Sequence, residues 1–252
     1  MQARRLPAAR GIAWVTEGFV LYRRGPALLI MLTMFYLLVA VGSGLLQPVG
    51  PFLLSLLLPT LTALVGNGCR ILDRPPGTVL EQIALLQGLA AQRRPLLRLG
   101  VLQLIGTLLV LGVDLLFDSG DWASLALKED AVQPLQLLRL LLIASPMFMA
   151  FWFAPLLTAW DQVPPAKSLF FSLVASLRNW RAFLAYGAAV MLLGVALPGA
   201  FLYAAAAVSP ELFTLLASAL RMVLFLVLVP VLMASVYLSY RDIFVVSVSG
   251  YA

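Results

Sequence analysis

The 252-residue chain has no histidine, one cysteine and few charged residues. Without histidine it lacks the usual general base and the commonest transition-metal ligand. A single cysteine, Cys69, excludes an intramolecular disulfide and a thiolate cluster, and we interpret it as a small apolar residue at a helix end. No glycine-rich phosphate loop and no Walker lysine is present. We therefore expect no enzyme activity, no cofactor and no metal site.

Charge is scarce because apolar residues dominate the composition. Charged residues make up 11% of the chain and hydrophobic residues 62%, whereas soluble domains carry about 25% charged residues. This balance predicts an integral membrane protein. The net charge of +6 comes from basic residues beside apolar runs, where they set orientation and meet anionic lipid headgroups. We expect no nucleic-acid partner.

Six apolar runs are each long enough to cross a bilayer, which takes about 20 residues. Prolines inside several runs are compatible with spanning helices that pack against neighbours. The first run leads directly into the second, so we do not expect a cleaved signal peptide. The sequence predicts an all-α polytopic membrane helix bundle, one integral membrane domain over 1–252, with spans at 27–46, 49–68, 96–117, 140–160, 182–208 and 222–240.

Basic residues favour one orientation of these spans. If the N-terminus lies inside, the outer side carries only Lys128, Arg139 and Arg221 of the seventeen basic residues. The segments concerned are short enough for the positive-inside rule to apply. We predict a multi-pass protein of the bacterial inner membrane with both termini in the cytoplasm.

The order of features repeats three times, in units at about 8–74, 75–162 and 163–244. Each unit has an amphipathic segment (11–22, 78–92 and 168–177), then basic residues and two spans, and it closes on an aspartate: Asp73, Asp161 or Asp242. We predict that the segments are helices at the membrane interface; the alternative is linker helices packed against the bundle. The basic residues are predicted to contact anionic headgroups: Arg23, Arg24, Arg93, Arg94, Arg178 and Arg181.

Three short stretches carry a family resemblance: Arg-Gly-Ile-Ala-Trp at 10–14 with Gly18 and Phe19, Asn-Gly-Cys-Arg-Ile-Leu-Asp at 67–73, and Ser-Tyr-Arg-Asp-Ile-Phe at 239–244. Together they resemble an uncharacterised family of bacterial six-helix inner-membrane proteins ending in a Tyr-Arg-Asp-Ile-Phe motif. That family is similar in layout to the membrane domain found beside glycerophosphodiester phosphodiesterases. The resemblance implies six helices with both ends inside and supplies no catalytic or binding residue.

Three charged residues lie near the predicted outer edge of the membrane: Asp114, Arg139 and Arg221. A charge at mid-bilayer costs about 2.5–3.5 kcal/mol on insertion scales. Our hypothesis is that Asp114 pairs with Arg139 or Arg221 inside the bundle; the alternative is that each side chain extends to the outer surface. The predicted outer loop at 118–134 is acidic, which indicates a solvated loop, with a calcium or partner site as the alternative.

Two function classes fit these features. The first is a membrane component without catalytic activity: a subunit, assembly factor or scaffold that binds another membrane protein or a second copy of itself. The alternative is a transporter or lipid-handling protein, because transporters often combine repeats with broken helices. Membrane lipids with anionic headgroups are expected partners of both.

Overall fold

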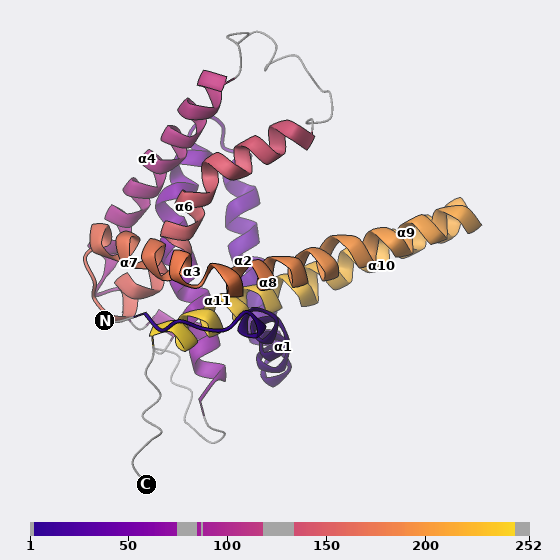
Figure 1. Cartoon of the computed structure of the whole chain (residues 1–252), viewed down its shortest axis with the longest axis horizontal. Coiled ribbons are helices and arrows are strands. Elements are labelled where there is room, and N and C mark those ends of the chain that lie inside the picture. The colour runs from indigo at the N-terminus through magenta and orange to yellow at the C-terminus, as the bar shows by residue number, and fades with distance from the viewer. Residues whose placement is uncertain (1–2, 75–84, 87, 118–133, 245–252) are drawn as a thin grey trace.

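The computed structural model describes residues 3–74, 85–86, 88–117 and 134–244, and within them every regular element is helical. In chain order the helices are α1 (Ala9–Arg24), α2 (Pro26–Gly44), α3 (Gly50–Leu72), α4 (Arg93–Phe117), α6 (Pro134–Trp160), α7 (Pro165–Arg178), α8 (Trp180–Met191), α9 (Leu197–Val208), α10 (Pro210–Val223) and α11 (Val229–Phe244), with π-helical segments η2 (Leu192–Ala196) and η3 (Leu224–Leu228). Figure 1 shows α1, α3, α8 and α11 close together, with α4 and α6 extending upward and α9 and α10 extending to the right.

The six predicted spans are confirmed. Four are formed by α2, α3, α4 and α6, and two are continuous helical runs, Trp180–Val208 and Pro210–Phe244. The last run begins at Pro210 rather than at Met222, where the apolar stretch was predicted to begin. Ser209 explains this start, because its hydroxyl accepts a hydrogen bond from the Leu212 N–H at 3.1 Å and Pro210 occupies the first turn.

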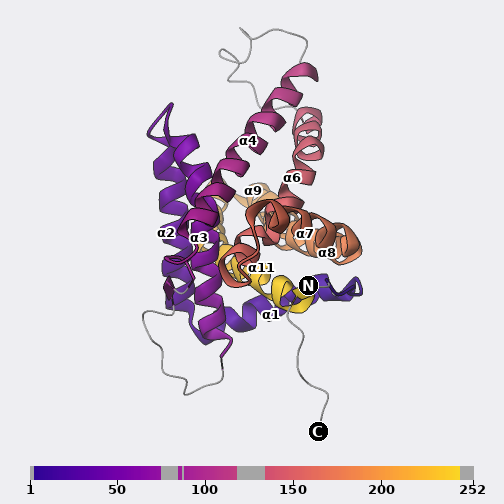
Figure 2. The ribbon, with the colours of Figure 1, turned by 90° about the vertical axis from the view of Figure 1, so that its left-hand side faces the viewer.

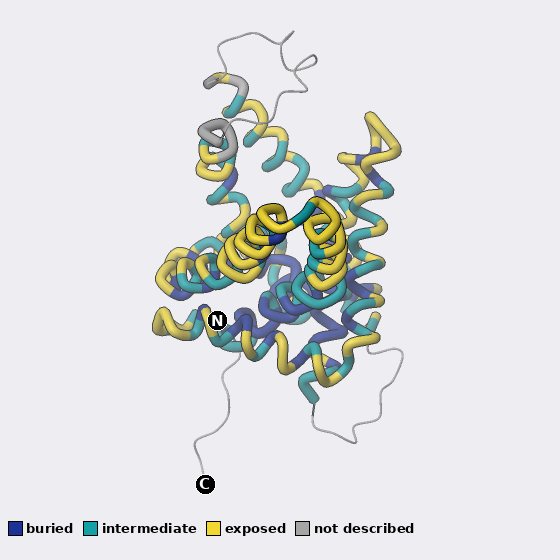
Figure 3. The backbone as a smooth tube through the Cα atoms, turned by 90° about the vertical axis from the view of Figure 1, so that its right-hand side faces the viewer, coloured by how far each residue is buried: buried dark blue, intermediate teal, exposed yellow. Residues whose placement is uncertain are grey.

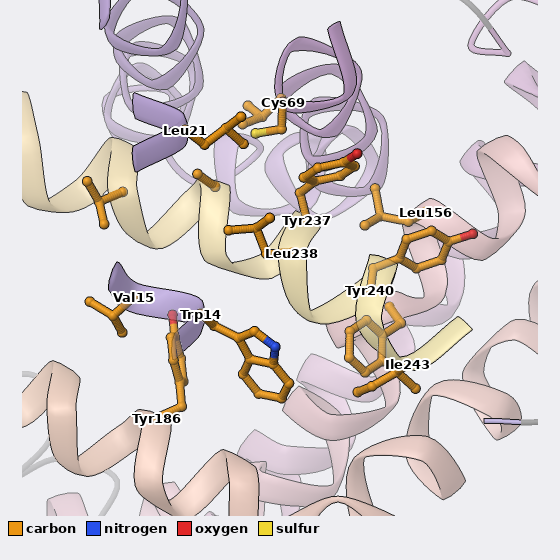
Figure 4. Packing of buried hydrophobic residues seen from close by; sticks show 14 of the residues in the cluster. Trp14, Val15, Leu21, Cys69, Leu156, Tyr186, Tyr237, Leu238, Tyr240 and Ile243 are labelled. Atoms are coloured by element: carbon orange, nitrogen blue, oxygen red, sulfur yellow. The ribbon is translucent and has the colours of Figure 1, made fainter. Parts of the chain in front are cut away.

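The core lies where α1 crosses α8 and α11. Glycine permits this approach: a Cβ at Gly11 would lie 1.9 Å from the Ala182 carbonyl oxygen, and one at Gly18 would lie 2.8 Å from that of Val231. Trp14 is fully buried in the resulting contact. Figure 4 shows its indole in the same core as Tyr186, Leu238 and other residues of α8 and α11.

A serine of α7 is inserted into the hydrogen-bond ladder of α6. The Phe153 N–H donates to the Ser172 hydroxyl at 2.9 Å, and this hydroxyl donates to the Met149 carbonyl at 2.8 Å. The insertion lies beside Pro155, whose ring cannot fit a regular helical turn. Ser168 and Ser176 lie on the same buried face of α7, so α7 is fixed to α6 by polar contacts.

The third hairpin diverges from the other two beyond its base. Figure 2 shows α2 beside α3, with α4 between α3 and α6. In contrast, α9 and α10 pack mainly against each other, and Figure 1 shows this pair extending away from the bundle, while Figure 3 looks toward its free end. We call α9 and α10 together the arm. Of its residues, Pro198 and Ala205 are buried.

The structure does not confirm the three-unit repeat. The first and third amphipathic segments form α1 and α7, but α1 packs on α8 and α11 of the third unit, and α7 packs on α6 of the second. The predicted helix at 78–92 is wrong for its described part: Gly88 has a φ of +78°, which no α-helix contains. Residues 78–84 and 87 lie outside the described part of the chain.

Candidate functional site

Asp242, near the end of α11, is the centre of a polar cluster that joins α11 to α1. It accepts hydrogen bonds from Trp14 Nε1 at 3.0 Å and from Arg10 Nε at 3.0 Å, and it forms an ion pair with the Arg10 guanidinium. Its side chain is 12% exposed. Helix packing brings Asp242 to α1 because the backbones touch at Gly18, one turn beyond Trp14.

The cluster continues to α3 through a second arginine. Arg241 Nη2 lies 3.1 Å from a Glu17 carboxylate oxygen, and Arg241 Nη1 lies 3.0 Å from an Asp73 oxygen. Tyr237 also donates its hydroxyl hydrogen to Asp73, at 2.9 Å. Arg10 closes the cluster by pairing with Glu17 at 2.8 Å. We refer to this set as the polar network: Arg10, Trp14, Glu17, Asp73, Tyr237, Arg241 and Asp242.

Each acid of the polar network has a basic partner. Its acids are Glu17, Asp73 and Asp242, and each of them pairs with Arg10 or Arg241; the exposed Arg24 adds a longer contact of 3.6 Å to Asp73. Burial opposes the charge on Arg10, but hydrogen bonds from Arg10 to Asp242 and Glu17 outweigh it and raise the pKa of Arg10. Together with Arg24, the two arginines of the network neutralise its three acids, and the network fixes three helices together.

A second polar group lies at the junction of α3 and α6. Trp160 donates from Nε1 to Asn67 at 2.8 Å, and the Arg70 guanidinium lies over the Trp160 ring, 5.3 Å from its centroid. Tyr240 donates its hydroxyl hydrogen to Asp161. Burial raises the pKa of Asp161, although the hydrogen bond from Tyr240 acts in the opposite direction.

All three aspartates that close the predicted units thus accept a hydrogen bond from an aromatic side chain. Trp14 donates to Asp242, Tyr237 to Asp73 and Tyr240 to Asp161, and Figure 4 shows the three aromatic residues in one core. Sequence reasoning did not identify these contacts as a site. The signal was present, since each aspartate follows a span and the network includes residues of the motifs at 10–14, 67–73 and 239–244.

The structure brings together two of the three charged residues predicted near the outer edge. Arg139 Nε, on α6, lies 2.8 Å from Asp114 Oδ1 on α4. Arg221 lies apart from them, exposed on α10. The acidic loop predicted at 118–134 falls almost entirely outside the described residues.

The six arginines predicted to contact lipid are all exposed: Arg23, Arg24, Arg93, Arg94, Arg178 and Arg181. Two of these arginines lie at the end of a row of exposed apolar side chains, which we call an apolar stripe. The side chains of each stripe are spaced so that they share one face of a helix. On α1, Ile12 and Phe19 precede Arg23 along one face. On α7, Phe170 and Val174 precede Arg178 in the same way.

The described part of the chain holds one cysteine and no grouped metal ligands. Cys69 is fully buried, and burial of this kind makes a thiol inert. Among the described residues, no three side chains of the types His, Cys, Asp and Glu are grouped as metal ligands. What the arrangement provides is a rigid junction of α1, α3 and α11, with exposed apolar surfaces around it.

Comparison with known proteins gives one informative match. The chain is 34% identical to a protein of Burkholderia thailandensis named as a probable inner membrane protein, and the match covers 74% of each chain. No family model matches the sequence, and no solved structure matches it. The resemblance to the membrane domain beside glycerophosphodiester phosphodiesterases stays a prediction.

Proposed function

Because this chain belongs to the same family as the probable inner membrane protein of Burkholderia thailandensis, we propose that it is a membrane subunit without catalytic activity. Its partner is another membrane protein, which it binds through the arm. The exposed, self-paired arm is the observation that carries this proposal.

The polar network supports a structural role for the ionised side chains. Glu17, Asp73 and Asp242 are each engaged by arginine, and Asp73 and Asp242 also accept hydrogen bonds from aromatic side chains. A general acid or nucleophile needs a group free to react with a substrate. Groups that neutralise one another at the helix ends hold the bundle together instead.

The arm presents a face suited to contact with another helix. Small residues lie at helical spacing from the end of η2 along α9, where Ala196, Ala200 and Ala207 are exposed together with Tyr203. Small residues let the backbones of membrane helices approach closely, and such faces are typical of helix association in lipid. A Cβ added to Gly199 beside them would meet nothing within 4 Å, so the space there is open.

Two matched variants test the arm as the binding surface. Gly199→Leu fills the open face of α9, and Gly112→Leu places the same side chain on α4, where a Cβ also meets nothing within 4 Å. Each tagged protein is purified in mild detergent, and its bound proteins are identified by mass spectrometry. We expect the partner to be lost from Gly199→Leu and kept by Gly112→Leu. Equal recovery with both variants would contradict the proposal; recovery of untagged copies of the chain would identify the partner as itself.

Lipid handling is the second candidate, favoured by the exposed apolar stripes on α1 and α7 that end at Arg23 and Arg178. These stripes suit a helix at the headgroup boundary, with arginine paired to lipid phosphate. Binding to vesicles with and without anionic lipid tests this role, after reconstitution of wild type and Arg23→Gln. A preference for anionic lipid that the variant keeps would argue against the headgroup contact.

Both termini are proposed to face the cytoplasm. The Arg4 N–H donates to the Ile243 carbonyl at 3.0 Å, so the N-terminal segment lies beside the end of α11. An even number of spans agrees with ends on one side, and the arginine bias chooses the inner side. Reporter fusions at each terminus, active only in one compartment, test the orientation; reporters active on opposite sides would refute it.

A further inference from the structure

We propose that the arm pivots against the rest of the molecule at a pair of π-helical turns, η2 and η3. This inference does not depend on the identity of any partner. It rests on the backbone hydrogen bonds of the third hairpin, on two prolines in matching positions, and on an abrupt change in burial at the same level.

The two turns are built alike. The Leu197 N–H donates to the Leu192 carbonyl and the Val229 N–H donates to the Leu224 carbonyl, each five residues back instead of four. In both runs the next residue is a proline, Pro198 or Pro230. Proline has no N–H to donate, and its ring clashes with the carbonyl four residues earlier. The wider turn removes the clash at the cost of regular hydrogen bonding, and bends concentrate at such sites.

The turns also lie beside each other across the hairpin. A Cβ at Gly194, in η2, would be 3.4 Å from Leu228 Cδ2, in η3. Both helices are therefore weakened at one level. A single weak turn would be held by its straight neighbour, whereas two at the same level allow the pair to bend together.

The burial of side chains in the third hairpin changes at the level of η2 and η3. On the base side, Ala182 and Tyr186 precede η2 and are buried, and α11 beyond η3 has nine buried residues from Pro230 to Ile243. The π-helical turns themselves contain no buried residue, and neither does α10. Contacts thus fix the hairpin below the turns, while above them the two helices of the arm hold mainly each other.

The last helical run, Pro210–Phe244, is longer than the hydrocarbon core is thick. Pro210–Phe244 has 35 residues, and at 1.5 Å per residue it is about 52 Å long, against a hydrocarbon core of about 30 Å. A helix of this length either extends beyond the core or lies tilted within it. A pivot in mid-helix lets the arm change its tilt without disturbing the polar network at the base.

Pulsed electron–electron spin resonance in liposomes measures the motion directly. Spin labels on Leu45→Cys, at the turn between α2 and α3, and Tyr203→Cys, on the arm, report the distance across the pivot; these positions are 84% and 83% exposed. Labels on Leu45→Cys and Leu116→Cys, which is 84% exposed on α4, form the control pair. Cys69 is fully buried and is replaced by alanine in every sample.

We expect a broader distance distribution for the arm pair than for the control pair. Pro198→Ala with Pro230→Ala should restore regular hydrogen bonding and narrow the arm distribution, whereas Pro155→Ala in α6 should leave it unchanged. An arm distribution as narrow as the control in the otherwise wild-type protein would overturn the proposal, and this comparison needs no proline variant to fold. A broad distribution that keeps its width in the double alanine variant would also overturn it.

Discussion

Substitution of Asp242 offers the sharpest test of the polar network, because asparagine and alanine remove different parts of it. Asp242→Asn keeps an oxygen that accepts from Trp14 Nε1 but loses the negative charge opposite Arg10. Asp242→Ala loses both. Trp14 is 0% exposed, so in the alanine variant its N–H has no water to replace the lost acceptor.

Loss of the negative charge and loss of the hydrogen-bond acceptor have separate costs in stability. A hydrogen bond to a charged group contributes about 1.5–3 kcal/mol, and the lower part of that range applies because Arg10 is partly exposed and also pairs with Glu17. Asp242→Asn should therefore destabilise the protein by about 1.5–2 kcal/mol. A buried donor without a partner costs about 1–3 kcal/mol, so Asp242→Ala should lose that much in addition.

Unfolding by sodium dodecyl sulphate, followed by circular dichroism at fixed lipid and detergent composition, gives the free energies. The measurement is repeated in a Trp14→Phe background, which removes the N–H donor but keeps an aromatic ring. There, the difference between Asp242→Asn and Asp242→Ala should shrink by the cost of the unpaired Trp14 N–H, and only packing and the hydrogen bond from Arg10 still distinguish the two variants. If both variants are equally stable in the wild-type background, or if Trp14→Phe leaves the difference intact, the assignment of Asp242 as the acceptor for Trp14 is wrong.

Further predictions concern the packing of α1, α6 and α7 and the carboxyl of Asp161. Ser172→Ala removes the hydroxyl between the Phe153 N–H and the Met149 carbonyl, and we expect a loss of about 1–3 kcal/mol in the same unfolding assay; wild-type stability would show that the two backbone groups rejoin directly. Gly11→Ala should abolish the native fold, seen as loss of a monodisperse gel-filtration peak, because its Cβ would lie 1.9 Å from a backbone oxygen; Gly187→Ala, with open space, is the control. Burial raises the pKa of Asp161 in the folded state, so folding favours the protonated carboxyl, and stability falls as pH rises through that pKa. Asp161→Asn cannot ionise, and the wild type should lose stability relative to it from about pH 4 upward; parallel pH profiles would contradict this.

The sequence by itself determined the number and approximate place of the spans. An apolar run of sufficient length must cross the bilayer as a helix, because lipid offers no partner for backbone groups. That constraint is local, so it can be read from consecutive residues, and all six runs became helices. The apolar runs did not fix the helix ends: α10 begins at Pro210 because Ser209 and Pro210 favour a helix start outside the apolar run.

Only the tertiary structure decided which charged and aromatic residues meet. Arg10 and Asp242 are 232 positions apart, and Tyr237 and Asp73 are 164 apart. The pairing of Arg10 with Asp242 depends on how α1 crosses α8 and α11. Close backbone contacts at Gly11 with α8 and at Gly18 with α11 permit this crossing, and no periodicity in the sequence predicts it. Likewise, the prolines at 198 and 230 were visible in the sequence, but the contact between the π-helical turns that precede them, Gly194 in η2 beside Leu228 in η3, follows from the register of the hairpin. A bilayer acts on each segment separately, whereas contacts between segments depend on the shape of the whole bundle.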